Sequence, residues 1–554
     1  MTWREGTLAL VAAWAVWRAL KALTSKNPLD KVPGPKPDPF FFGSALRLFD
    51  PVGGWDFHAE IASKYPGIAR IVGIQGSNIL YTFDPKAMHH ILVKDHHNVF
   101  DESDRFLQMN SLLFGPSLLS VKGDRHRRQR KLLNPVFSIA HMREMTPTFY
   151  SVAYRLRDSL HQILKEGQPT EIDIASWMTR TALELIGQSG LGTSFDSLEP
   201  DASEHPFATT LKNLLQGLSD IPFARFFLLP RVGHIGPPQF RRWVVERVPS
   251  KSIRKVVNMS DVMHRTSSEI YQRKKRALDE GDELDKSVIG ILLRENMNAS
   301  EEDRIPEDEV LAQLSTITFA AMDTTSNALC RVLLLLSGNP EVQERLRQEI
   351  LDAKEQRGGS DLSYDELVQL PYLDAICRET LRLYPPSPFV TRQARQDTIL
   401  PLSIPFISTD GKPTHEVLVP KGTLVLVSIM AANKNPELWG PDAHEWKPER
   451  WLNPLPETVV NAKMPGVYSH LPGPYFRMTF IGGGRSCIGF KFSQLEIKTI
   501  LCSLLESFRF TPTGKKIRWQ LNGVVQPTVV SEEPGSASAG KALKLQMPLN
   551  VSRL

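Results

Sequence analysis

The alternation of apolar and polar residues predicts a few strands in a chain that is otherwise helical. Two segments alternate clearly: residues 68–82, interrupted at Gly76 and Ser77, and residues 416–427, interrupted at 420–422. Alternation on both sides of a turn is typical of a β-hairpin, so each segment predicts one. Most other apolar residues recur with the helical period of about 3.6 residues. This pattern predicts a mainly α fold with a small β part.

The longest predicted helix begins at Pro306 and ends at a Ser-Gly-Asn-Pro stop signal. Three acidic residues fill its first turn, where they favour a helix N-terminus. A helix of about 32 residues is roughly 48 Å long and crosses an entire domain. Its middle, residues 318–325, is therefore predicted to be buried. A capping box of Ser363 and Glu366 begins a second helical region, which ends at Tyr384.

The first residues predict a membrane anchor. Residues 6–17 are continuously apolar, and helix formers continue after Arg18 and Lys21. A full span needs about 20 residues, and these two long side chains can reach the headgroups from within the membrane. Because basic residues follow the segment, the rest of the chain is expected on the cytosolic side. We predict an anchor and linker over residues 1–29 and one large domain over residues 30–554; a cleaved signal peptide is the alternative.

Composition narrows the class of protein. The 554 residues are 41% hydrophobic and 23% charged, which is typical of a globular fold and excludes collagen, disorder and a polytopic membrane protein. The net charge of +5 is small for this length and does not point to nucleic acid. The 4 cysteines include no CxxC pair, which excludes a disulfide scaffold and a zinc-finger module and favours a reducing compartment.

Residues 480–489 read FIGGGRSCIG and carry the clearest chemical signal. They match FxxGxRxCxG at every fixed position, a coincidence expected in about 2 of 10,000 chains of this length. A cysteine thiolate donates electron density to iron, and nearby positive charge and N–H groups keep it deprotonated. The segment resembles the haem-binding loop of the cytochrome P450 family of haem-thiolate monooxygenases. The resemblance predicts the cytochrome P450 fold for the domain that follows the anchor.

The resemblance assigns roles within this loop. Cys487 is expected to be the axial ligand of heme b, and Phe480 to shield its sulfur from water. The guanidinium of Arg485 is expected to bind a haem propionate through two N–H groups. Gly483 and Gly489 let the backbone approach the porphyrin closely. The other three cysteines are expected to be small buried residues.

Arginines elsewhere match the family in the expected order. Glu379 and Arg382 fit its ExxR motif on one helix face, and Arg450 fits the third member of a buried Glu-Arg-Arg network. The basic segment 122–131 alone suggests nucleic acid, an anionic membrane or a solvated helix face. The resemblance adds another interpretation, in which propionate-binding and partner-binding residues share this segment.

The expected propionate ligands are His126, Arg130 and Arg392. His126 stands where the family usually has tryptophan, and at i and i+4 it shares a helix face with Arg130. The remaining charges of that helix can then face an acidic redox partner.

Within the long helix, Asp323 and Thr324 resemble the family's oxygen-activation signature. A buried acid beside a hydroxyl can relay protons to dioxygen through water, which is general acid catalysis. A threonine that hydrogen-bonds the preceding turn and bends the helix is the alternative. Ala321 departs from the pattern, because glycine is usual there, and its methyl group narrows the expected groove.

The resemblance is strongest to fungal, basidiomycete-type microsomal members. It implies a monooxygenase of the endoplasmic reticulum membrane that inserts one oxygen atom from O2 into a lipophilic substrate, either a terpenoid or other secondary metabolite or a range of aromatic and steroid-like compounds. Electrons would come from NADPH through NADPH–cytochrome P450 reductase, with cytochrome b5 as a further candidate donor. Residues 237–248 mix aromatic, apolar and basic residues and predict either a membrane-dipping segment or an ordinary surface helix. The expected substrate contacts are Phe389, Val390, Val524 and Val525.

Three alternatives remain. A haem-thiolate isomerase or dehydratase would need no external electrons, although the intact Asp323 and Thr324 argue against it. A non-catalytic haem binder would consume no NADPH. A nucleic-acid-binding protein would show salt-sensitive binding to DNA or RNA.

Overall fold

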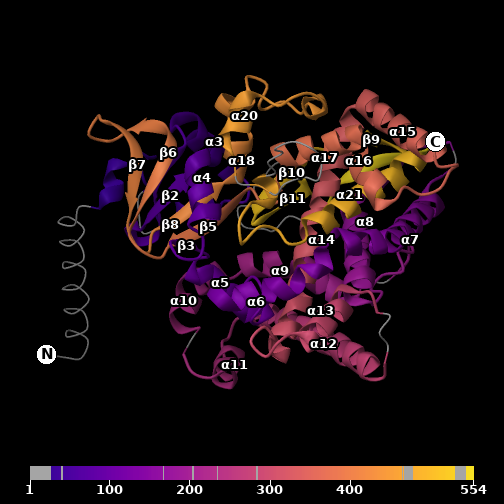
Figure 1. Ribbon diagram of the computed structural model, residues 1–554, viewed down its shortest axis with the longest axis horizontal. Helices are drawn as coiled ribbons and strands as arrows, with labels where there is room; N and C mark the ends of the chain where they lie inside the picture. Colours follow the sequence, from indigo (N-terminus) through magenta and orange to yellow (C-terminus); the bar gives the residue numbers. More distant parts are fainter. Residues whose placement is uncertain are drawn as a thin grey trace.

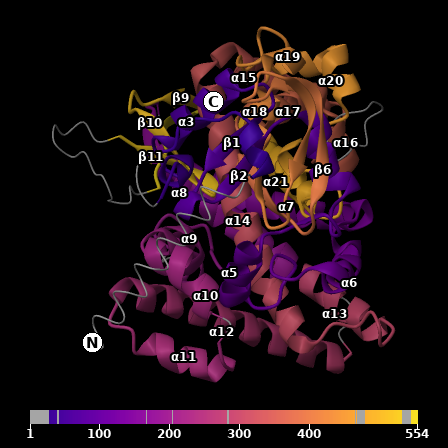
Figure 2. The same cartoon turned by 90° about the vertical axis from the view of Figure 1, so that its left-hand side faces the viewer.

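The computed structural model describes residues 27–38, 42–165, 167–202, 205–233, 235–281, 285–464, 466, 478–530 and 545–554. The predicted membrane anchor therefore lies outside the described residues. Figure 1 shows a strand-rich part that contains β2, β5 and β8 beside a larger helical part. Figures 1 and 2 agree that α11, α12 and α13 form one end of the molecule.

The helices confirm the predicted mainly α fold. They are α2 Ala45–Leu48, α3 Gly54–Lys64, α4 Pro85–His89, α5 Asp104–Phe114, α6 Gly123–Leu133, α7 Ile139–Ile163, α8 Ile174–Leu185, α9 Pro206–Ser219, α10 Leu229–Val232, α11 Pro238–Glu246, α12 Lys251–Asp279, α13 Val288–Asn298, α14 Glu307–Gly338, α15 Pro340–Glu355, α16 Tyr364–Gln369, α17 Pro371–Leu383, α18 Ile429–Asn433, α19 Pro436–Trp439, α20 Glu457–Ala462 and α21 Phe490–Ser507.

The strands form four small sheets. They are β1 Ile68–Val72, β2 Asn78–Thr82, β3 Phe100–Asp101, β4 Thr170–Asp173, β5 Phe389–Ala394, β6 Thr398–Ile407, β7 Pro413–Val419, β8 Leu424–Ser428, β9 Phe508–Pro512, β10 Ile517–Asn522, β11 Val524–Val529 and β12 Pro548–Arg553. The largest sheet has the order β1-β2-β8-β5-β3, and a second has the order β4-β12-β9. Two hairpins, β6-β7 and β10-β11, complete the β part.

One of the two predicted hairpins is confirmed and the other is wrong. β1 and β2 pair antiparallel, with Ile68 opposite Thr82. The segment 416–427 does contain two strands, but β7 pairs with β6, whereas β8 lies between β2 and β5. The physical reason is that β8 begins with the run Leu-Val-Leu-Val, so both of its faces are apolar. A strand of this kind is buried on both faces, as in the middle of a sheet, where it pairs with a strand along each edge.

The long helix α14 confirms the predicted element and its ends. It contacts α8, α12, α17 and α21, so it runs through the centre of the helical part. Among the described residues it is the one helix long and apolar enough to cross a membrane, and 61% of its most apolar stretch is buried inside the protein. It is therefore a core helix. Within the predicted buried middle, Met322, Asp323 and Thr325 are buried, but Ala320 is exposed and Thr324 is half-buried.

The second predicted helical region is also confirmed. Ser363 Oγ accepts a hydrogen bond from the Glu366 amide, and the Glu366 carboxylate accepts one from the Ser363 amide. This capping box begins α16, and α17 follows directly and ends before Tyr384. The helices α16, α17 and α21 all pack in the same core as α14.

Candidate active site

The cysteine loop lies between the short helical turn η8, Met478–Phe480, and α21. Its shape depends on Gly483, whose φ of +77° favours glycine. A Cβ atom there would lie 2.0 Å from the carbonyl oxygen of Leu92, and one at Gly484 would lie 2.4 Å from Nε2 of His96. The loop therefore packs on the backbone of Leu92 and Val93 and on the imidazole rings of His96 and His97. Gly489 is the N-cap residue of α21 and fixes where the loop ends.

Cys487 is held by the backbone of its own loop. Its amide donates a hydrogen bond to the Phe480 carbonyl at 2.9 Å, and Phe480 itself is buried. The Cys487 side chain is exposed, although the protein atoms around it desolvate the thiol; those of the other three cysteines are buried, as predicted. Burial raises the pKa of the Cys487 thiol, while the Gly489 N–H and the Arg130 charge lower it. These surroundings suit a thiolate ligand, because a bound metal would offset the cost of desolvating the negative sulfur.

The three predicted propionate-binding arginines are each held by a protein partner. Arg130 donates to the carbonyl and hydroxyl oxygens of Ser486, at 2.7 and 2.9 Å. Arg485 donates to the Asp101 carboxylate at 3.0 Å, and Arg392 pairs with Glu102 at 2.8 Å. The structure places Arg130 and Arg485 at the cysteine loop, and Arg485 and Arg392 on adjacent acids of one segment.

Three nitrogen atoms beside this loop are buried and have no hydrogen-bond partner within the described part of the chain. They are Nε of Arg485 and Nδ1 of His126 and His97. The His126 and His97 rings lie 5.7 Å apart. Burial, together with the charges of Arg485 and Arg130, lowers the pKa of His126 to about 2, so its imidazole is neutral. Buried nitrogens without partners indicate that these side chains face a ligand or water.

His97 is a site residue that the sequence prediction missed. It lies in no motif, and its φ of +76° is uncommon for a residue with a side chain. The sequence signal that points to it is the adjacent pair His96 and His97.

These residues fit a haem. An accessible thiol on a loop between two glycines supplies the iron ligand, and the unpartnered nitrogens of Arg485, His126 and His97 supply donors for the acidic groups of the porphyrin edge. No group of three or more histidine, cysteine, aspartate or glutamate residues suited to a metal ion occurs in the described ranges. The fit to a haem rests on the one accessible thiol and on the unpartnered nitrogens near it.

The predicted Glu-Arg-Arg network is assembled behind the loop. Arg382 donates to Glu379 at 2.7 and 2.8 Å, and Arg450 Nε approaches the same carboxylate at 3.4 Å. The Trp451 ring nitrogen donates to it at 2.9 Å. Arg382 also donates to the Asn433 carbonyl at 2.6 Å, so α17 is bonded to the C-terminal end of α18.

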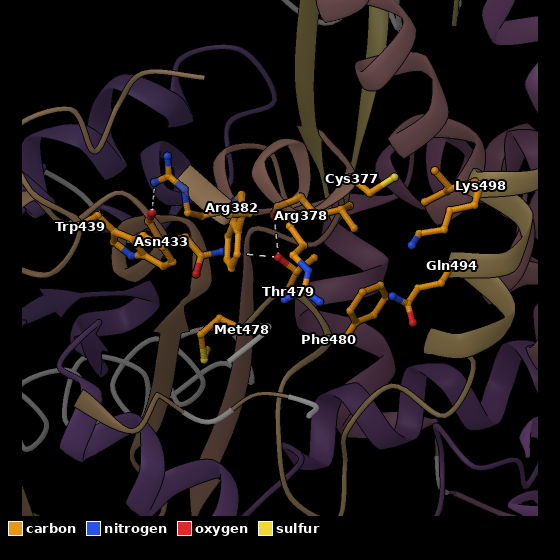
Figure 3. A pocket seen from close by; sticks show the side chains of 13 residues that line it. Cys377, Arg378, Arg382, Asn433, Trp439, Met478, Thr479, Phe480, Gln494 and Lys498 are labelled. Carbon is orange, nitrogen blue, oxygen red and sulfur yellow. Dashed lines mark hydrogen bonds between the residues drawn. The ribbon is translucent and has the colours of Figure 1, made fainter. Parts of the chain in front are cut away.

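A pocket of about 30 Å³ separates this network from the cysteine loop (Figure 3). Thr479 and Phe480 approach it from the loop side, and Arg382 and Lys498 approach from α17 and α21. The Thr479 hydroxyl donates to the Leu381 carbonyl at 2.6 Å. The pocket lies behind η8, and Cys487 does not line it. It is therefore part of the structure that supports the loop and not part of the space in which the reaction takes place.

Asp323 and Thr324 lie in the middle of α14, as predicted. Asp323 is buried, one of its carboxylate oxygens has no partner, and burial raises its pKa to about 7. The Thr324 hydroxyl donates to the Ala320 carbonyl at 2.8 Å. Next to it, Thr325 donates to the Ser493 hydroxyl at 3.2 Å, which connects α14 to α21 just after the cysteine loop. The acid and the half-buried hydroxyl are thus close to the element that follows the ligand.

The predicted substrate contacts lie on two strands. The Phe389 ring stacks on His58 at 5.3 Å, and Val390 follows it in β5. Val524 and Val525 begin β11, and the Val525 amide donates to the Pro386 carbonyl at 2.8 Å. This hydrogen bond brings β11 against the turn that precedes β5. Contact with a substrate remains a prediction for these four residues.

Comparisons with known proteins agree with this site. The cytochrome P450 family model matches residues 32–532. Cytochrome P450 monooxygenase 91 of Postia placenta is 46% identical over 98% of this chain and 97% of that protein. Ganoderic acid synthetase CYP5150L8 of Ganoderma lucidum is 42% identical over 95% of this chain and 96% of that protein. The crystal structure of the cytochrome P450 CYP102L1 has a TM-score of 0.69 at 21% identity and covers 94% of this chain and 100% of that one.

The fold and the cysteine loop thus define a haem-thiolate monooxygenase. The chain belongs to the cytochrome P450 family, and the two fungal relatives named above are basidiomycete proteins. The family carries haem on a cysteine thiolate, for which Cys487 is the matching residue. This confirms the resemblance that the sequence motifs predicted.

Proposed function

We propose that this chain is a membrane-bound monooxygenase that oxidises a terpenoid secondary metabolite with electrons from NADPH–cytochrome P450 reductase. The observation that carries the substrate class is 42% identity, along 95% of the chain, to a protein named ganoderic acid synthetase. The reaction class rests on the accessible Cys487 and on the acid and hydroxyl of Asp323 and Thr324 in α14.

When bound, haem supplies the activation of O2 and the transfer of one oxygen atom. The chain supplies the proton path and the positions of the groups. Asp323, with a pKa of about 7, can hold or release a proton at neutral pH. The Thr324 hydroxyl can accept or donate one beside it, while Arg485 and His126 would hold acidic groups of the cofactor.

Membrane attachment is supported by α11, none of whose side chains is buried. It exposes Phe240, Trp243 and Val244, and Arg247 stacks on the Trp243 ring at 4.1 Å. Aromatic and apolar side chains flanked by arginines suit a helix that lies in the headgroup region. We propose that α11 rests on the endoplasmic reticulum membrane and that the anchor predicted near the N-terminus holds the domain there.

The docking of a reductase is supported by α6. Arg127 and Lys131 are exposed on this helix, and Arg130 between them is bonded to the cysteine loop. An acidic surface of the reductase, or of cytochrome b5, would therefore approach the protein on the side of Cys487. Double replacement of Arg127 and Lys131 by glutamate should slow electron transfer and weaken its dependence on salt.

The test is a substrate panel in microsomes that contain the full chain and the reductase. Terpenoids and steroids are incubated with NADPH under ¹⁸O2, and the Cys487→Ser variant is the matched control. We expect a product heavier by one ¹⁸O atom that needs both NADPH and Cys487. An isomerised or dehydrated product formed without NADPH would replace this proposal by the isomerase alternative.

A further inference from the structure

Arg331 is a half-buried cation with a buried Nε, on the same face of α14 as Thr324. The two residues are seven positions apart, which places them on one helix face about 10 Å from each other. The guanidinium of Arg331 lies 3.4 Å from the centre of the Trp519 ring and 4.2 Å from that of Tyr384. Its side chain makes no hydrogen bond or ion pair within the ranges that the structure describes, and its buried Nε has no partner. The Trp55 ring nitrogen donates to the Trp519 carbonyl at 2.8 Å and so supports this aromatic wall.

A second cation faces the same aromatic residue. Lys434 Nζ lies 5.2 Å from the centre of the Tyr384 ring. Burial lowers the pKa of Arg331 to about 9 and that of Lys434 to about 8, and each of the charges that act on Lys434 is positive. The fully buried cations of the described ranges, by contrast, have carboxylate partners, such as Lys498 with Asp374 at 3.0 Å. Two half-buried cations without a carboxylate partner produce a local positive potential that attracts an anion.

Arg331 borders a pocket of about 20 Å³. Asn327 of α14, Pro385 and Pro386 after α17, and Val525 of β11 line it together with Arg331 and the two rings. Such a space holds about one or two waters, or the two oxygen atoms of a carboxylate. The lining also includes Val525 and the prolines that precede β5, so the pocket adjoins the predicted substrate contacts.

We propose that Arg331 binds the carboxylate of a lipophilic acid substrate. Asn327 and Thr324 lie towards the cysteine loop on the same helix face, so the apolar body of the acid would extend along α14 towards Cys487. Oxidation would then fall on a carbon remote from the carboxylate. This inference rests on the proposed function, because it names the chemical class of substrate for the same site.

The first experiment measures anion binding without turnover. The full-length haem protein is heated in sodium acetate or sodium chloride at constant ionic strength. We expect acetate to raise the melting temperature of the wild type more than chloride does, and to have no such effect on Arg331→Gln. Arg518→Gln is the matched control, because Arg518 precedes Trp519 in β10 and points to the opposite face. Equal effects of the two salts, or an acetate effect that Arg331→Gln retains, would overturn the proposal.

The second experiment separates a substrate carboxylate from a free anion. Dehydroabietic acid and its methyl ester are titrated into the same proteins while the Soret band is followed. We expect the wild type to bind the acid about tenfold more tightly than the ester, and Arg331→Gln to lose this preference. If Arg331→Gln does not fold, Lys434→Gln should reduce the preference in the same direction. A carboxylate site with no preference for the acid would be a site for free anions only, which overturns the substrate assignment but leaves NADPH-dependent oxidation of neutral terpenoids intact.

Discussion

The carboxylate of Glu379 accepts two hydrogen bonds from the guanidinium of Arg382, at 2.7 and 2.8 Å, and both side chains are buried. Removal of Arg382 takes the two shortest hydrogen bonds from the buried Glu379 carboxylate, and the remaining cation, Arg450, approaches it only at 3.4 Å. We therefore expect Arg382→Leu to lower the free energy of unfolding by about 3–5 kcal/mol. Chemical denaturation measures this loss, and the fraction of protein that carries haem should fall with it because the pair supports the cysteine loop.

An exposed pair on the surface provides the control. Glu60 and Lys64 in α3 form an ion pair at 2.9 Å, and both side chains are accessible to solvent. Because solvent screens such pairs, Glu60→Gln should leave the unfolding midpoint unchanged. If Arg382→Leu unfolds at the same denaturant concentration as Glu60→Gln, the buried network does not stabilise this fold.

Elements with local signals were predictable from the sequence. The helix α14 begins and ends where its acidic first turn and its Ser-Gly-Asn-Pro stop place it, and the capping box of α16 involves residues three positions apart. The partners of a strand are not local. β8 pairs with β2, about 340 residues earlier in the chain, so the alternation within 416–427 identified two strands but could not identify their neighbours.

The candidate site also has a local part that the sequence predicted and a non-local part that it did not. The spacing of Arg485 and Cys487 identified a haem-binding loop, because the whole motif lies within ten consecutive residues. The partners of that loop come from distant segments: Asp101 holds Arg485 and residues 90–97 pack on the glycines. His97 and Arg331 escaped notice because their roles depend on burial and on neighbours that only the folded chain brings together.

Cys487 is predicted to be the axial ligand, and the prediction has a direct spectroscopic test. Cys487→Ser should abolish the strongly red-shifted Soret band of the reduced protein with carbon monoxide, because a hydroxyl does not replace a thiolate on iron. Cys330→Ala is the control, since Cys330 is buried in the core on α14 and should leave the band in place. A red-shifted band in Cys487→Ser would mean that another residue binds the iron.

Thr324 is predicted to take part in proton delivery. Thr324→Ala should lower the product formed per NADPH by about tenfold or more and release hydrogen peroxide instead, since proton transfer of this kind contributes factors of about 100 or above. Thr318→Ala is a matched control: its hydroxyl makes the same bond to the carbonyl four residues earlier, at 2.7 Å, but it is fully buried. Equal coupling in the two variants would place the proton path elsewhere.

Asp323 gives the stability of the protein a defined pH dependence. Burial raises its pKa from 3.8 to about 7, so the folded chain keeps a proton that the unfolded chain releases. The stability that this group contributes is complete below pH 3.8. It falls as the pH rises from 3.8 to about 7 and is lost above about pH 7. Asp323→Asn cannot release this proton.

The wild type should therefore lose stability relative to Asp323→Asn as the pH rises, by on the order of 3 kcal/mol between pH 5 and pH 8. Urea denaturation of both proteins at pH 5, 6, 7 and 8 measures the difference. Glu496, whose pKa burial also raises, is present in both proteins and cancels. Parallel curves would show that Asp323 is ionised in the folded state throughout this range. In that case it could not hold, at neutral pH, the proton that the relay beside Thr324 requires.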